Sequence, residues 1–162
     1  MSTPLHPLIV HFPIALLTLG ALVQLVALWK PSFWNRVANF SLITGFISGM
    51  AAYLTGDGGE HYAKQVFGTK ESAIHTHESF AFYTLIVFGI IVAIKLYQMF
   101  PLHSQLKKYG RYSASKVFIP LLLVLCLAGG TLVFLTGHYG GKLVYSSNGT
   151  AAERETIRSS TN

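Results

Sequence analysis

Four stretches of the chain are apolar over about the 20 residues that cross a bilayer as a helix, and polar linkers separate them. We predict membrane helices over residues 8–29, 37–55, 79–100 and 117–137. The residues that follow 145 are mostly small and polar, which is typical of a segment that forms no packed core. We therefore expect an all-α transmembrane four-helix bundle over residues 1–145 and a disordered tail over residues 146–162.

The composition excludes a water-soluble domain. Hydrophobic residues make up 51% of the 162 positions and charged residues only 11%, against about 25% in an ordinary soluble domain. So few charges cannot cover a soluble surface of this size. The chain has one cysteine, Cys126, which excludes an internal disulfide and any CxxC metal or redox motif.

The charges are sorted by membrane side. Four crossings place both termini on one side, together with the linker between the second and third helices. The opposite side has seven cations and no acid: Lys30, Arg36, Lys95, Lys107, Lys108, Arg111 and Lys116. The terminal side has five cations and all six acids: Lys64, Lys70, Lys142, Arg154, Arg158, Asp57, Glu60, Glu71, Glu78, Glu153 and Glu155.

Cytoplasmic loops of membrane proteins carry the excess of lysine and arginine. We therefore predict a multi-pass protein of the bacterial inner membrane with both termini periplasmic. Lys95 lies near the cytoplasmic end of its helix, where we expect its aliphatic stem to let the ammonium reach the interface. We therefore interpret the cations behind the net charge of +6 as determinants of membrane orientation and not as a nucleic-acid-binding surface.

Two sequence matches indicate an internal repeat. The pattern H-x3-A-x2-T-L begins at His11 and again at His77, an offset of 66 residues. The return helices share G-x3-(Y/F)-L-T-G-x2-G, which begins at Gly49 and at Gly130, an offset of 81. We predict a duplicated helical hairpin whose copies are related by a pseudo-twofold axis along the membrane normal.

The repeat predicts a histidine pair. In an up-down four-helix bundle the first and third helices are diagonally opposite, so we expect His11 and His77 to face each other at matching depth. At 100° per residue, positions four and seven residues further along lie within about 40° of each histidine. These positions hold small residues that leave room for a flat group: Ala15 and Thr18, and Ala81 and Thr84.

A b-type haem fits this expectation, with His11 and His77 as axial ligands near the periplasmic face. The chain has no CxxCH, which excludes covalent c-type attachment. His138 takes the place of Asp57 in the aligned repeat, so it is a candidate for a propionate contact or a second centre. A chlorophyll-type pigment held by histidine is a close variant of this hypothesis.

Other functions stay open. His11, His77 and His138 with Asp57 or Glu60 would also suit copper or zinc. A quinone-binding protein and a cofactor-free structural subunit are further alternatives. We find no catalytic constellation, which favours an electron carrier or accessory subunit over an enzyme. Two more histidines near the same membrane face are candidate metal ligands: His6 and His75.

The opening LHPLIVHFPIALL at residues 5–17, His77-Glu78 and GHYGGKLVY at residues 137–145 carry a resemblance. They resemble the bacterial inner-membrane family catalogued as domain of unknown function 2231, from about residue 4 to residue 145. The resemblance implies a four-helix membrane protein, sometimes found beside or fused to c-type cytochrome modules. We therefore expect a partner among c-type cytochromes or other membrane subunits.

Overall fold

A computed structural model describes residues 5–56, 59–60, 63–64, 69–99 and 110–160, and side chains are described for residues 6, 8–56, 59–60, 63–64, 69–99 and 117–143. Its main elements are helices: α1 (Leu5–Ile9), α2 (His11–Ala27), α3 (Pro31–Leu54), α5 (Glu71–Met99) and α6 (Gly110–Ser160). The prediction of an all-α membrane bundle is confirmed. Asp57, His61 and His103 lie outside the described residues.

The described helices account for four membrane crossings. α3, α5 and Val117–Leu143 of α6 are each long and apolar enough to span a bilayer. α2 has only 17 residues, but α1 extends it almost without interruption. The Val10 amide donates to the His6 carbonyl (3.1 Å) and the Ile14 amide to the Val10 carbonyl (3.3 Å), so helical bonding continues across Val10. From Leu8 onward this pair of helices reaches the crossing length of about 20 residues.

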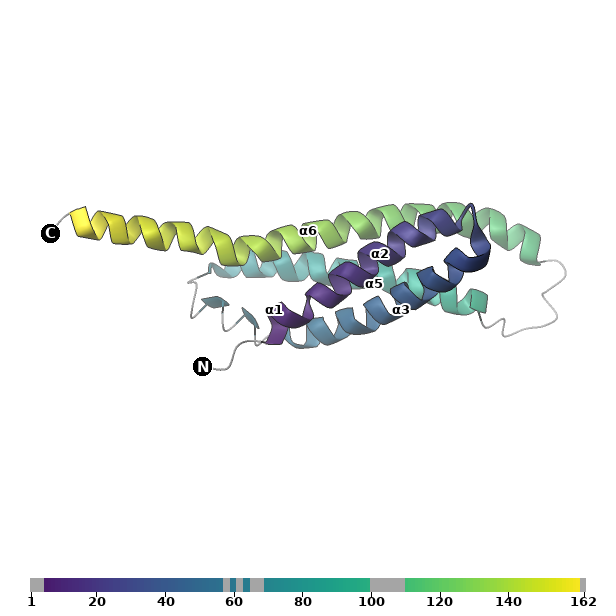
Figure 1. Cartoon of the computed structure of the whole chain (residues 1–162), viewed down its shortest axis with the longest axis horizontal. Helices are drawn as coiled ribbons and strands as arrows, with labels where there is room; N and C mark the ends of the chain where they lie inside the picture. The colour runs from purple at the N-terminus through teal and green to yellow at the C-terminus, as the bar shows by residue number, and fades with distance from the viewer. Residues whose placement is uncertain (1–4, 57–58, 61–62, 65–68, 100–109, 161–162) are drawn as a thin grey trace.

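The helices form an up-down bundle (Figure 1). α2 packs against α3 and α6, and α5 packs against α6 and α3, so α2 and α5 are diagonally opposite, as predicted. We call the end with α1, the last turn of α3 and the start of α5 the terminal end. The opposite end, where residues 28–30 link α2 to α3, is the hairpin end.

Burial along α2 and α5 confirms a repeat but corrects its alignment. Five of the seven buried positions on α2 match a buried position exactly 71 residues later: Pro13 and Thr84, Leu17 and Phe88, Gly20 and Ile91, Ala21 and Val92, Gln24 and Lys95. The predicted offset of 66 is wrong, because it would pair buried Leu17 with exposed Tyr83. The repeat partner of His77 is therefore His6, not His11.

The return helices align at an offset of 84 within the bundle: Ala38 and Leu122, Leu42 and Cys126, Gly45 and Gly129, and Gly49 and Val133 are all buried. Contacts agree with this offset, since a Cβ at Gly45 would meet Leu17 and a Cβ at Gly129 would meet Phe88. The predicted offset of 81 holds only beyond Thr55. There α3 ends while α6 continues, which shifts the alignment by three residues.

Two further expectations differ from the structure. Lys95 does not extend to the interface, because it is 3% exposed and donates from Nζ to Asn35 Oδ1 at 3.0 Å inside the bundle. An acceptor in the interior competes successfully with the longer reach to water. The segment that we expected to be disordered continues as helix α6 as far as Ser160, and Figure 1 shows it projecting beyond the terminal end.

The close packing of α2 on α3 predicts that alanine substitution affects the stability of the protein very differently at two glycines. A Cβ at Gly20 would lie 2.9 Å from Leu42 Cδ2 and 3.1 Å from the Leu42 backbone nitrogen, whereas a Cβ at Gly130 would meet nothing within 4 Å. We expect Gly20→Ala to destabilise the protein by about 1–3 kcal/mol through overpacking. Gly130→Ala should be neutral or stabilise by up to about 1 kcal/mol through helix propensity. Denaturation in detergent measures both, and equal effects would contradict this packing.

Candidate functional site

The imidazole of His6 is held against the last turn of α3. Its Nδ1 lies 3.0 Å from the Ala52 carbonyl oxygen and 3.2 Å from Thr55 Oγ1. The Thr55 hydroxyl itself donates to the Ala52 carbonyl at 2.8 Å, so both oxygens act as acceptors toward the ring. A carbonyl cannot donate, so the ring proton is on Nδ1. In the neutral imidazole, Nε2 then carries the lone pair.

His77 repeats this arrangement on α5. Its Nδ1 donates to the Thr136 carbonyl of α6 at 3.0 Å, the position 84 residues after Ala52. Two turns further along α5, the buried Thr84 hydroxyl lies 2.9 Å from the Thr136 hydroxyl and ties the two helices together. The neutral His77 ring therefore also presents its lone pair at Nε2.

A glycine lies directly against each imidazole. A Cβ at Gly59 would lie 2.9 Å from His6 Cδ2, and a Cβ at Gly140 would lie 3.0 Å from His77 Cε1. Any larger residue would push the ring away from its carbonyl acceptor. The repeated unit is thus a histidine, a helix carbonyl and a glycine, and the protein has two copies at the terminal end. We call this pair of units the imidazole site.

The electrostatics of the imidazole site favour neutral rings. Burial lowers the pKa of His6, and the hydrogen bond to the Ala52 carbonyl offsets this only in part. The two rings are also within electrostatic reach of each other, so a charge on one disfavours a charge on the other. Neutral imidazole with its N–H bound to a backbone carbonyl is the form in which histidine ligates metals.

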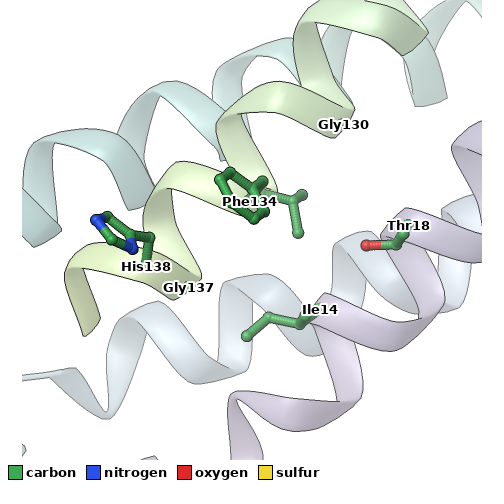
Figure 2. Close-up of a pocket in the computed structure, with 7 residues that line it drawn as sticks. Ile14, Thr18, Gly130, Phe134, Gly137 and His138 are labelled. Carbon is green, nitrogen blue, oxygen red and sulfur yellow. The ribbon is translucent and has the colours of Figure 1, made fainter. Parts of the chain in front are cut away.

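A lateral groove of about 350 Å³ lies between α2 and α6 (Figure 2). Gly137, which directly follows the Thr136 that holds His77, is part of its wall. His138 stacks on Phe134 with ring centroids 6.3 Å apart and planes within 9°. The groove is mainly apolar, and its lining comes from two helices: Ile14, Thr18, Gly130, Val133, Phe134, Gly137 and His138.

The structure brings together only part of the predicted site. Thr18 and His138 both line the groove, and Thr84 and His77 both contact Thr136 of α6. His11 is exposed, whereas His77 is half-buried against Gly140, so the two histidines are not in matching surroundings. Ala15 is exposed as well, and Ala81 is half-buried.

His75 is exposed and lies beside two acids. Its ring nitrogens are 3.9 Å from a Glu71 oxygen and 3.4 Å from a Glu78 oxygen. Among the side chains that the structure describes, no three histidine, cysteine or acidic groups are placed to hold one metal ion. The mixed set predicted around His11, His77 and His138 is therefore not assembled there, and its Asp57 falls outside the described residues.

His6 is the main residue that the sequence interpretation undervalued, because Pro7 after it is typical of a helix start. A signal for it exists in the sequence. Gln24 and Lys95 are strongly polar residues near the ends of otherwise apolar runs, and aligning them gives the offset of 71 that pairs His6 with His77. The shorter H-x3-A-x2-T-L match obscured this alignment.

The fold and the imidazole site define an all-α membrane protein with four crossings and a duplicated hairpin. The chain matches the family DUF2231, described as a predicted membrane protein, over residues 2–153, and so belongs to that family. Comparisons with curated proteins and with solved structures give no significant match.

The lowered pKa of His6 predicts an acid-sensitive terminal end. The folded protein binds a proton at His6 more weakly than the unfolded chain, so stability present at neutral pH falls as pH drops below about 6.5, the usual histidine value. We expect His6→Asn, which keeps an N–H donor but cannot titrate, to make this dependence shallower. Thermal unfolding in detergent at a series of pH values measures it. An unchanged pH dependence in His6→Asn would refute the prediction.

Proposed function

We propose that this protein is an electron carrier of the bacterial inner membrane that binds a b-type haem through Nε2 of His6 and His77. The observation that carries this proposal is the duplicated imidazole site, in which both Nδ1–H groups are bound by helix carbonyls. That hydrogen bond fixes ring orientation and raises the basicity of the other nitrogen. Two such rings, one on α1 and one on α5, match the bis-histidine arrangement that helix bundles offer.

The surroundings support a large planar ligand. The groove between α2 and α6 begins next to Thr136, so it can accept one apolar edge of a porphyrin held at the imidazole site. Gly130 and Gly137 leave open space there, since a Cβ at either would meet nothing within 4 Å. Phe134 supplies an aromatic wall, and His138 at the groove supplies a polar contact for a propionate. When bound, haem iron would supply one-electron chemistry.

The chain's own residues would control that chemistry in three ways. The Ala52 and Thr136 carbonyls hold the ligand rings, Gly59 and Gly140 fix how far each ring can move, and the apolar groove excludes water. Burial and ligand basicity of this kind tune the potential of a haem. The charge sorting supports a periplasmic position for the imidazole site, where a c-type cytochrome or another membrane subunit would exchange electrons with it.

The first test is an absorption spectrum of the full chain, purified in mild detergent from cells supplied with haem. We expect a Soret band and, after reduction with dithionite, sharp α and β bands of low-spin haem. His6→Ala and His77→Ala should each abolish these bands, while His11→Ala and His75→Ala keep them. Loss of the bands in His11→Ala but not in His6→Ala would overturn the proposed ligands.

Two adjacent glycines provide a matched control. Gly140→Ala should displace the His77 ring and weaken haem binding at least about tenfold, which corresponds to about 1.4 kcal/mol. Gly141→Ala should bind as the unaltered protein does, because a Cβ there meets nothing within 4 Å. A folded protein that stays colourless would contradict the haem proposal. Copper found by metal analysis, and lost in His6→Ala, would assign the imidazole site to that metal instead.

A further inference from the structure

A second polar layer lies inside the bundle near the hairpin end, far along α2 and α5 from the imidazole site. Lys95 is 3% exposed and Gln24 is 1% exposed, and the repeat places them at the same level on diagonal helices. Asn35, which accepts the hydrogen bond from Lys95, and Asn39 are one turn apart on α3 and so share a face. We call these four residues the inner polar layer.

The hydrogen bonds of the inner polar layer are incomplete. An ammonium has three donors, and the bond to Asn35 Oδ1 at 3.0 Å uses one. In the described part of the chain, two buried amide oxygens have no donor, Gln24 Oε1 and Asn39 Oδ1. Buried polar atoms without protein partners commonly bind ordered water, which makes two to four hydrogen bonds. Donors and acceptors are thus both left over in one layer, which is the condition under which water bridges them.

We propose that the inner polar layer is a hydrated proton-binding site, in which water links Lys95 Nζ to Gln24 and Asn39 and exchanges protons with the aqueous phase at the hairpin end. The layer lies about one helical turn inside that end, since α3 begins at Pro31 and α2 ends at Ala27. Ionisable groups inside membrane segments characteristically mark ion or proton pathways. This inference is independent of the haem proposal.

The described groups around Lys95 are mostly neutral, so no neighbouring carboxylate fixes its protonation state. From α6, the buried Cys126 is the titratable group within electrostatic reach among the described side chains. α3 contributes the neutral amides of Asn35 and Asn39, and α2 contributes Gln24. The described side chains include no carboxylate at this end, where Lys30 and Arg36 are exposed. Water and amide oxygens therefore supply the stabilisation that an acid would otherwise give to the ammonium.

Nuclear magnetic resonance of the full chain with isotope-labelled lysine, in lipid bilayers, tests this site. The Lys95 signal is assigned by its loss in Lys95→Arg, with Lys142→Arg as a control for the assignment. We expect the Lys95 Nζ signal to change reversibly between ammonium and amine as pH rises, and to receive magnetisation from water. A signal that keeps one protonation state at all pH values and receives nothing from water would overturn the proposal.

Amide variants separate a hydrated site from a dry hydrogen bond. Gln24→Met and Asn39→Leu preserve side-chain size but remove the acceptors, so each should reduce the transfer from water and weaken proton binding by Lys95 several-fold. Gln98→Met makes the same change at an exposed position on α5 and should leave both quantities unaltered. If Gln24→Met and Asn39→Leu both behave like Gln98→Met, water does not connect these groups and the proposal fails.

Discussion

Hydrocarbon offers a polar side chain no hydrogen-bond partner, and this constraint organises the bundle. Most lipid-facing positions are apolar, and polar groups in the spans are satisfied by the protein or by internal water. The structure concentrates them at two levels. His77 and Thr84 bond to α6 near one end, and Lys95 bonds to Asn35 near the other. Between these levels the core is mainly apolar, with Leu42, Phe88 and Ile91 fully buried and Ser41 as a buried polar residue.

Duplication of the hairpin explains why each polar level contains one residue from each half of the chain. One hairpin supplies a histidine near its start and a polar residue near its turn, and the second hairpin supplies the same two features. The copies have diverged at the hairpin end, where Gln24 matches Lys95, but at the terminal end both retain histidine, carbonyl and glycine. Such symmetry gives a pair of identical imidazoles at the terminal end, whereas at the hairpin end it pairs an amide with an ammonium.

The sequence predicted the crossings because apolar runs of bilayer length are a strong signal that depends on local composition. It predicted the helix ends less well, since polar turns such as Glu71 to Glu78 extend a helix beyond its apolar core. Pairing His11 with His77 failed for a different reason. Small residues at exposed positions produced a sequence match, and only packing shows that His11 lies outside while Pro13 and Leu17 face the core. Which histidine faces inward depends on contacts between helices that no short motif encodes.

The unbroken course of α6 has a mechanical consequence. The helix extends past the bundle for residues 144–160, which at 1.5 Å per residue is about 25 Å. The same helix carries Thr136, whose carbonyl holds His77, and the wall of the groove. A partner that binds the projecting part of α6 could therefore change the geometry of the imidazole site. Tilting α6 would move one ring relative to the other, whereas the break in α3 at Thr55 isolates the Ala52 carbonyl from motion beyond it.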